Sequence, residues 1–323
     1  MAMISRLLAL ALACAVPGAA FAQAWPSKPI KAIVPFAPGS ATDQIARAFG
    51  AKMSETLGQP IVIENRAGAN GMIGADAVAK APPDGYTILF GTNSTNAALK
   101  SLMKKLPYDQ DTAFTAVGYM GSVSLIVAVN NDVPVKSLTE LIALARSKPN
   151  YVTFATASTS QRISSEMLAG MAGVKMTNVP YKSSPGAITD LISGQVMMFT
   201  ADFAVMLPQV KAGKVRALAV TSAKRSDVAP DLPTVAEAGG PALKDYELIA
   251  FFGAYAPAGT PRDVVAKLND AINKAAQSKE LIARFNTLGL ETHPGTPEAF
   301  AQRTAQEAVK WAKAIKDAGI EPE

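Results

Sequence analysis

IKAIVPFAPGSATDQIARAFG, residues 30–50, joins an apolar run, a turn and the start of a helix. A proline and a glycine shape the turn, and Ser40 or Thr42 can cap the helix that follows. Apolar residues then recur every four positions from Ile45, and Gly58 comes directly after the last of them. This spacing predicts an amphipathic helix that packs one face against a core and ends at that glycine.

Short apolar runs like the first one recur along the chain, with helical patterns between them. Their apolarity is continuous rather than alternating, which favours strands buried on both faces and parallel connections through helices. The chain is therefore predicted to be α/β. The runs are residues 30–36, 60–65, 86–92, 124–130, 151–156, 175–181, 195–201, 215–221 and 251–257. At the C-terminal end, Phe300, Ala308, Trp311 and Ile315 share one face of a last predicted helix.

The N-terminus predicts export. Residues 1–24 contain a basic start, a short apolar run and small residues at the end, which is typical of a secretory signal peptide. Cleavage is expected before Gln23 or Trp25, although lipidation at Cys14 is an alternative. Removing this segment lowers the formal net charge of +5 by one, because Arg6 is lost. The mature protein is expected to work in the periplasm.

Composition argues against several classes of protein. Lys and Arg are scattered along the chain, which does not favour nucleic-acid binding. Cys14 is the single cysteine and His293 the single histidine, and His293 lies in a stretch that reads as a surface loop. Phosphate-loop, G-x-S-x-G and C-x-x-C motifs are missing, and the S-x-x-K at Ser101 has no companion motifs. No cofactor or metal is expected.

Hydroxyl-rich turns follow several of the predicted strands. Parallel α/β sheets place their ligands at such strand ends, where helices begin with amides that lack intrahelical partners. Each turn alone reads as ordinary helix capping, but together they predict a pocket for a small polar anion. The turns are residues 36–43, 92–95, 157–160 and 181–184.

Charged residues near these turns leave alternatives open. Asp43 lies in the first turn of its helix, where it can stabilise the helix or meet a ligand hydroxyl, amine or water. Arg162 and Lys182 can neutralise an anion or can be solvated surface charges. Asp202 follows a strand and can face the pocket or cap the next helix.

The chain also resembles a known family over nearly all of its mature length. Successive landmarks include KPIKAIVPFAPGSATDQIAR, QPIVIENRAGANGMIGADAVAKAPPDGYTILFGTN, KKLPYD, VPYKSSPGAITDLISGQV, LPQVKAGKVRALAVTSAKR, DLPTVAEAGG and APAGTPRDVVAKLN. These are similar to the Bug (Bordetella uptake gene) receptors, which are extracytoplasmic solute-binding proteins of tripartite tricarboxylate transporters. Two loops depart from the commonest form, since GSATD replaces a multiple-glycine turn and FATASTSQRISSEML carries Arg162 near the usual histidine place.

The resemblance implies a periplasmic-binding-protein type 2-like fold, with two α/β lobes joined by two crossovers. Lobe 1 would comprise residues 25–122 plus 254–323, and lobe 2 residues 123–253. A small organic carboxylate would lie between the lobes, and the receptor, expected to be a monomer, would deliver it to membrane transporter subunits. A ligand sensor for a membrane regulator is the alternative, and an exported hydrolase or isomerase is a weaker one.

By position, the resemblance places the ligand contacts on four loops and one strand end. They are Phe36, Gly39, Ser40, Ala41, Thr42 and Asp43; Thr92, Asn93, Ser94 and Thr95; Thr156, Ala157, Ser158, Thr159 and Arg162; Tyr181, Lys182 and Ser183; and Asp202.

Overall fold

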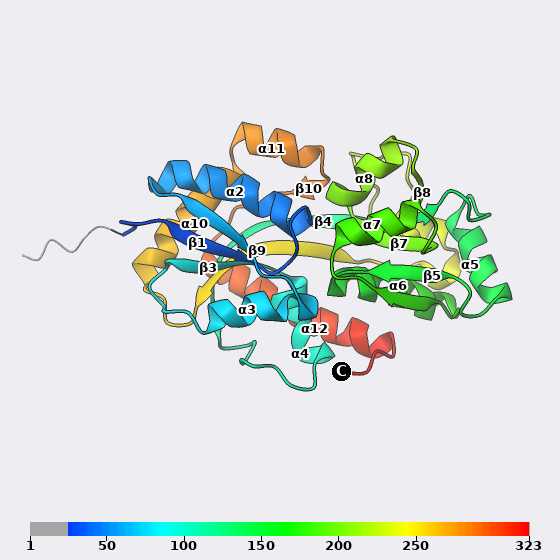
Figure 1. Ribbon diagram of the computed structural model, residues 1–323, viewed down its shortest axis with the longest axis horizontal. Coiled ribbons are helices and arrows are strands. Elements are labelled where there is room, and N and C mark those ends of the chain that lie inside the picture. Colours follow the sequence, from blue (N-terminus) through cyan, green and yellow to red (C-terminus); the bar gives the residue numbers. More distant parts are fainter. Residues whose placement is uncertain (1–24, 323) are drawn as a thin grey trace, which may run out of the picture.

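The computed structural model describes residues 25–322, so the predicted signal peptide lies outside the described residues. The described chain forms two α/β lobes that lie side by side along the long axis of the molecule (Figure 1). A single ten-stranded sheet runs through both lobes in the order β2-β1-β3-β9-β4-β7-β5-β6, and β8 and β10 each pair with β4. The α/β prediction and the two-lobe fold class are confirmed.

The first lobe contains one half of this sheet and the helices that cover it. Its strands are β1 (Ile30–Val34), β2 (Ile61–Asn65), β3 (Thr87–Thr92), β9 (Ile249–Pro257) and β10 (Leu290–Glu291). Its helices are α2 (Ala41–Leu57), α3 (Met72–Ala79), α4 (Leu99–Leu102), α10 (Arg262–Ala276), α11 (Lys279–Asn286) and α12 (Pro297–Asp317), with single turns η2 (Ala69–Gly71) and η3 (Ser94–Ala98). Figure 1 shows α2 on one side of these strands and α3 with α12 on the other.

The second lobe repeats the α/β pattern. Its strands are β5 (Thr153–Thr156), β6 (Thr177–Pro180), β7 (Met198–Asp202) and β8 (Val215–Val220). Its helices are α5 (Leu138–Ser147), α6 (Thr159–Ala172), α7 (Ser184–Ile192), α8 (Phe203–Lys211) and α9 (Val235–Ala238), with the single turn η4 (Pro241–Leu243).

One long strand, β4 (Phe114–Asn130), belongs to both lobes. Its first part pairs with β9 as far as Ser124, which lies opposite Ile249, and its second part pairs with β7 and β8 from Leu125 onward. The chain therefore passes between the lobes on β4 and returns at the start of β9. Lobe boundaries at 122/123 and 253/254 stay a prediction.

Strand direction corrects part of the sequence-based expectation. The outer strands are parallel, as predicted, since β1 pairs with β2 and β3, and β5 pairs with β6 and β7. However, β4 runs antiparallel to β7, β8, β9 and β10. Continuous apolarity reports burial on both faces, and central strands of this mixed sheet are equally buried whichever way they run.

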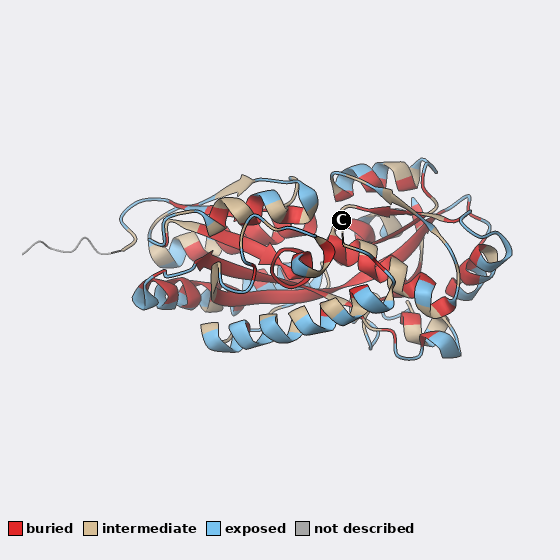
Figure 2. Cartoon of the chain, turned by 90° about the horizontal axis from the view of Figure 1, so that it is seen from below, coloured by how far each residue is buried: buried red, intermediate tan, exposed pale blue. Residues whose placement is uncertain are grey.

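The predicted helical stripes lie in the core. On α2, Ile45, Phe49 and Met53 are buried, and Gly58 ends the helix in the left-handed conformation, with φ of 65°. On α12, Phe300 and Trp311 are buried, together with Ile315. Figure 2 shows the buried strands at the centre of the molecule and the exposed faces of the helices outside them. Both helix predictions are confirmed.

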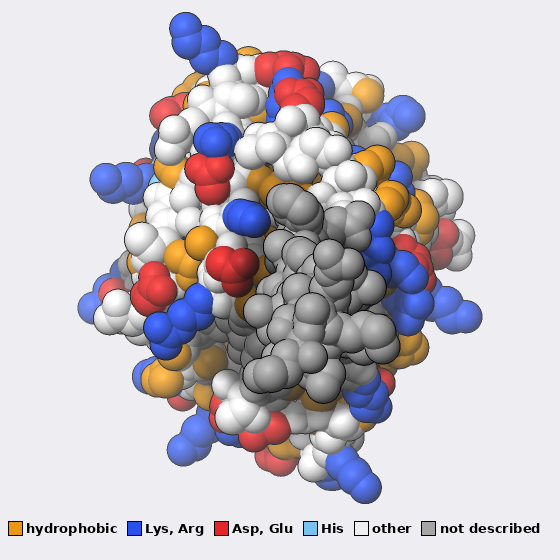
Figure 3. Space-filling view, turned by 90° about the vertical axis from the view of Figure 1, so that its left-hand side faces the viewer, with side chains coloured by type: hydrophobic (Ala, Val, Ile, Leu, Met, Phe, Trp, Pro, Cys, Tyr) orange, Lys and Arg blue, Asp and Glu red, His pale blue; other side chains and the backbone are white. Residues whose placement is uncertain are grey.

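The surface is mixed in charge. On the face shown in Figure 3, Lys and Arg side chains are scattered and Asp and Glu lie among them. His293 lies in the loop between β10 and α12 with half of its side chain exposed, as predicted. Among residues 25–322, no helix combines the length and the apolar composition needed to cross a bilayer.

Candidate functional site

A narrow cavity of about 20 Å³ lies between the two lobes, where strand ends and helix starts converge. The first lobe contributes the start of α2, the turn after β3 and part of β9, and the second contributes the starts of α6 and α7 and the end of β7. The lining residues are Phe36, Ser40, Ala41, Thr42, Thr92, Asn93, Ser94, Ser158, Ser160, Gln161, Ser184, Asp202, Ala250 and Phe252.

The start of α2 presents main-chain donors to this cavity. Ser40 is the N-cap, and its hydroxyl accepts a hydrogen bond from the Asp43 amide at 3.3 Å. The amides of Ala41 and Thr42 precede the first intrahelical bond, so no carbonyl of the helix can accept from them. Because both residues line the cavity, their amides supply partial positive charge to it.

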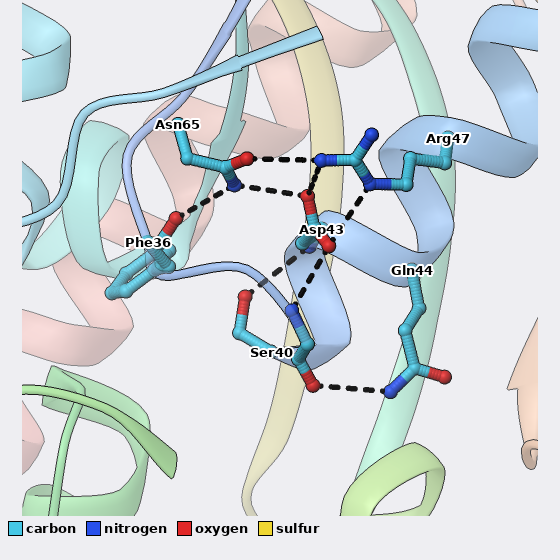
Figure 4. A network of polar contacts seen from close by, with 7 residues as sticks. Phe36, Ser40, Asp43, Gln44, Arg47 and Asn65 are labelled. Atoms are coloured by element: carbon cyan, nitrogen blue, oxygen red, sulfur yellow. Dashed lines mark hydrogen bonds and ion pairs between the residues drawn. The ribbon is translucent and has the colours of Figure 1, made fainter. Parts of the chain in front are cut away.

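Asp43 holds the α2 turn in place rather than lining the cavity. Its carboxylate accepts hydrogen bonds from the Gly39 amide at 3.0 Å and from the Asn65 side-chain amide at 2.9 Å, and it pairs with Arg47 at 2.9 Å (Figure 4). Asn65 also donates to the Phe36 carbonyl at 2.9 Å. Burial raises the pKa of Asp43, but the hydrogen bonds from Arg47, Gly39 and Asn65 outweigh it and leave the pKa below its ordinary value.

The turn after β3 directs one amide group into the cavity. Asn93 is 1% exposed, and its side-chain oxygen accepts a hydrogen bond from the Phe251 amide at 3.2 Å. Its Nδ2 atom is buried and has no protein hydrogen-bond partner. The Thr95 hydroxyl accepts from the Thr92 amide at 3.0 Å and fixes the turn from behind. Asn93 thus offers a buried donor whose natural partner is a ligand oxygen.

The start of α6 carries the largest set of free amides. Ser158 is its N-cap but makes no capping hydrogen bond through its side chain. The amides of Thr159, Ser160 and Gln161 therefore have neither an intrahelical nor a capping partner. Ser160 and Gln161 line the cavity.

Gln161 links three structural elements around the cavity. Its oxygen accepts from the Ala157 amide at 2.8 Å, and its nitrogen donates to the Ser184 hydroxyl at 2.9 Å. The Ser184 oxygen receives that hydrogen bond, so its own hydrogen is free to be donated to a ligand. Ser184 is the first residue of α7, and its main-chain amide also lacks an intrahelical partner.

Asp202 ends β7 and is the N-cap of α8, but its side chain makes no capping hydrogen bond. Burial raises the pKa of Asp202 to about 6, while its own main-chain amide and the Gln161 side chain act in the opposite direction. Asp202 is the single charged side chain among the described residues that line the cavity.

The structure brings nine of the predicted contacts to the cavity: Phe36, Ser40, Ala41, Thr42, Thr92, Asn93, Ser94, Ser158 and Asp202. Gly39, Asp43, Thr95, Thr156, Ala157, Thr159, Arg162, Tyr181, Lys182 and Ser183 are not among the residues that line it. Most of the residues outside the lining hold the lining residues or nearby strands in position.

The residues outside the lining have other partners. Thr156 donates to the Asn178 side chain at 2.8 Å, and the Tyr181 hydroxyl donates to Asp190 at 2.8 Å. Ser183 caps α7 by accepting from the Gly186 amide at 3.3 Å. Burial raises the pKa of Glu166, and the positive charge of Arg162, one turn earlier on α6, opposes that shift.

Sequence reasoning missed five lining residues: Ser160, Gln161, Ser184, Ala250 and Phe252. Ser160 and Ser184 lie within the predicted hydroxyl-rich turns 157–160 and 181–184, so turn chemistry indicated them although the contacts carried over from the family resemblance left them out. Ala250 and Phe252 belong to β9, whose start carries no polar signal. Only the spatial arrangement shows that this strand forms the floor of the cavity.

The chemistry of this arrangement is that of binding. Amides and hydroxyls surround one carboxyl group, and the lining contains no histidine, cysteine or lysine that could act as a base or nucleophile beside a serine. Within the described part of the chain, His, Cys, Asp and Glu side chains form no group of three or more that could hold a metal ion.

Comparison with known proteins agrees with this reading. Residues 45–320 match the family described as tripartite tricarboxylate transporter family receptor. Protein BugT of Bordetella pertussis is 35% identical over 301 residues, covering 92% of this chain and 91% of BugT.

Solved structures show the same architecture. Rpa4515 of R. palustris, solved with adipate, has a TM-score of 0.89 and 36% identity, with 93% of this chain and 100% of that chain covered. MatC of Rhodopseudomonas palustris, solved with bound malate, has a TM-score of 0.85 and 33% identity, with 90% of this chain and 100% of that chain covered. The matched family is one of receptors, and this chain is likewise a receptor rather than an enzyme. The chain therefore belongs to the tripartite tricarboxylate transporter receptor family, to which the Bug proteins belong.

Proposed function

We propose that this protein captures a small organic carboxylate in the cavity between its lobes and delivers it to the membrane subunits of a tripartite transporter. The observation that carries the proposal is the set of unpaired donors around the cavity: the first amides of α2, α6 and α7, and the Asn93 side chain. Such donors stabilise negative charge without a cation.

The relatives support the same ligand class. Rpa4515 was solved with adipate and MatC with malate, which are both small dicarboxylates. A cavity of about 20 Å³ has room for little more than one water molecule, so the lobes must separate to admit an acid. We therefore propose a small organic acid of the same class as these two.

Binding strength requires both lobes. One exposed helix terminus stabilises an anion by about 0.3–1 kcal/mol, whereas micromolar affinity corresponds to about 8 kcal/mol. Several donors must therefore act on the same ligand in a site that excludes water. Gly39 of the first lobe lies close to Pro185 of the second, since a β-carbon at Gly39 would be 3.4 Å from the Pro185 ring. The two lobes thus approach each other directly beside the ligand donors.

We further propose that residues 1–24 direct export and are removed, and that the mature receptor acts as a periplasmic monomer. Family membership supports a location outside the cytoplasm and a transporter partner. The contacts that we assign to the ligand are those of the cavity lining. Arg162, which lies outside that lining, is assigned no direct contact.

Isothermal titration calorimetry with a panel of mono-, di- and tricarboxylates, including aromatic acids, tests the proposal. We expect at least one acid to bind with micromolar or tighter affinity, and neutral sugars and amides of matched size not to bind. A folded protein that binds a neutral solute and none of the acids would contradict the proposal.

A further inference from the structure

Asp202 differs in charge and in hydrogen-bonding capacity from the other polar groups around the cavity. The other polar groups that line the cavity are amides and hydroxyls, which can donate to an anionic ligand, whereas an ionised carboxylate can only accept. Asp202 is 7% exposed, so solvent does not screen it effectively. An anionic acid placed beside it would meet a like charge.

No positive charge offsets Asp202 in this part of the described chain. The second-lobe residues that face it are Gln161 of α6 and Ser184 of α7, and its pairing partner on β4 is Leu125. The first lobe presents Ser40, Thr42 and Asn93, and β9 presents Ala250 and Phe252. None of these side chains is charged or titrates between about pH 4 and pH 9.

The repulsion is large enough to decide which acids bind. Two like charges in hydrogen-bonding range of each other repel strongly in a site that excludes water. Two changes can relieve it. Asp202 can take up a proton, or the ligand can bring a hydrogen-bond donor of its own to the Asp202 oxygens.

The hydrogen bonds in the cavity favour the second route. The Gln161 nitrogen donates to Ser184, and the Gln161 side chain also hydrogen-bonds Asp202. The Asn93 oxygen accepts from Phe251, which leaves the Asn93 nitrogen as a donor toward the ligand carboxylate. Asp202 is the one lining side chain restricted, when ionised, to accepting. Its protein donors, its own main-chain amide and the Gln161 side chain, are neutral, and a donor on the ligand would add to them.

We propose that Asp202 makes the receptor selective for carboxylic acids that carry a hydroxyl or ammonium group near the carboxylate, because this group donates a hydrogen bond to the Asp202 oxygens. The inference rests on the proposed function and adds the ligand feature that the second lobe recognises.

The affinity for acids that lack a donor should depend on pH. Burial already raises the pKa of Asp202 to about 6, and a bound anion without a donor raises it further. Binding of such an acid takes up a proton, so its affinity falls as pH rises above about 6, by up to tenfold per pH unit. An acid with a donor binds ionised Asp202 and shows a shallower decline.

Calorimetry with matched probes tests the proposal. Succinate, malate and aspartate share one skeleton and differ in carrying hydrogen, hydroxyl or ammonium, and propionate, lactate and alanine form a second set. If the four-carbon diacids bind, we expect malate or aspartate to bind at least tenfold more tightly than succinate at about pH 8. If the three-carbon acids bind, we expect lactate or alanine to bind at least tenfold more tightly than propionate. The member of the set that binds best identifies the donor.

The variant Asp202→Asn separates this role from general loss of the site. Asparagine keeps the size of the side chain but removes the charge. We expect the preference for the donor-bearing acid to fall at least tenfold and the pH dependence of succinate or propionate binding to disappear. Asp132→Asn, an exposed change in the same lobe, should leave both unchanged.

The wild-type protein provides a second readout that does not depend on the folding of the variant. Titrations in buffers of different ionisation enthalpy between about pH 7 and pH 8.5 report proton uptake. Equal or tighter binding of the unsubstituted acid in every set that binds would overturn the inference. If neither these sets nor any other carboxylate binds, the proposed function itself fails, and the two outcomes are therefore distinguishable.

Discussion

Two buried aspartates lie in the loops around the cavity, and their surroundings differ. Asp43 receives hydrogen bonds from Gly39, Asn65 and Arg47, whereas no Lys or Arg side chain lines the cavity beside Asp202. The pKa of Asp43 is therefore lowered despite burial, and that of Asp202 is raised by burial. The same residue type shapes a loop in one lobe and faces the cavity in the other.

Replacing Asp43 should destabilise the fold. We expect Asp43→Ala to lower the free energy of unfolding by about 2 kcal/mol near pH 7, because three donors lose their acceptor. Since the pKa of Asp43 is lowered in the folded state, this contribution is present above about pH 4 and is lost as pH falls through the folded pKa. Urea denaturation from pH 3 to pH 7 measures it. Asp245→Ala, an exposed change, should have little effect.

Replacing Asp202 should instead raise the free energy of unfolding. Its pKa of about 6 lies above the ordinary value of 3.8, so the folded protein loses stability as pH rises between these values. We expect Asp202→Asn to be more stable than the wild type by up to about 2–3 kcal/mol above pH 7 and similar to it below pH 4. Thermal unfolding across this range, without ligand, would show a constant difference if Asp202 were not destabilised by burial.

Asn93 provides the sharpest test of the donor arrangement. In Asn93→Asp, one oxygen can still accept from the Phe251 amide, while the other replaces the donor that faces the cavity. We expect affinity for a carboxylate to fall at least about a hundredfold, or 3 kcal/mol. Asn131→Asp makes the same chemical change at an exposed turn and should retain wild-type affinity. Retained binding in Asn93→Asp would exclude Asn93 as a donor.

At the scale of elements, helix starts and strand ends form the site, and sequence patterns predicted many of them. The turn at residues 36–43, the hydroxyl-rich turn at 92–95 and the starts of α6 and α7 were all visible as patterns. The first half of β4 was not, because Gly118 and Gly121 break its apolar run at the places where its pairing with β9 shifts in register. The floor supplied by β9 also depends on packing that no local pattern reports.

The contact between β9 and α12 supports that floor. A β-carbon at Gly253 would lie 2.0 Å from the Phe300 ring, which is buried. We expect Gly253→Ala to destabilise the protein by about 3 kcal/mol, because α12 must move away from the sheet. Gly170→Ala places a methyl group in open space on α6 and should be neutral or stabilising by up to about 1 kcal/mol. Urea denaturation of both variants checks the contrast.

At the scale of the whole molecule, one lobe is inserted into the other. The family resemblance predicted two lobes, but the place where the chain crosses could be read only from sheet pairing, since Ser124 and Ile249 lie directly opposite each other. The site likewise takes its lining from both lobes. The lobes also meet away from it, at Phe203 of α8, whose ring would lie 2.9 Å from a β-carbon at Gly289 in the first lobe.

This topology predicts that the first lobe can fold alone. Residues 25–124 and 249–322 joined by Asn-Gly should form a β-hairpin at the Ser124–Ile249 pair. We expect cooperative thermal unfolding, at lower stability than the whole receptor, and no binding of carboxylates, because α6, α7 and Asp202 are missing. Circular dichroism and calorimetry measure the two properties. A chain that lacks a cooperative transition would contradict the prediction.

The main-chain amides at the starts of α2, α6 and α7 remain after almost any substitution, since only proline removes the hydrogen. Affinity for acids is consequently a property inherited with the backbone, whereas discrimination among acids belongs to a few replaceable side chains such as Asp202 and Phe252. A change in ligand preference would then require substitutions among the lining side chains and would leave the main-chain donors in place.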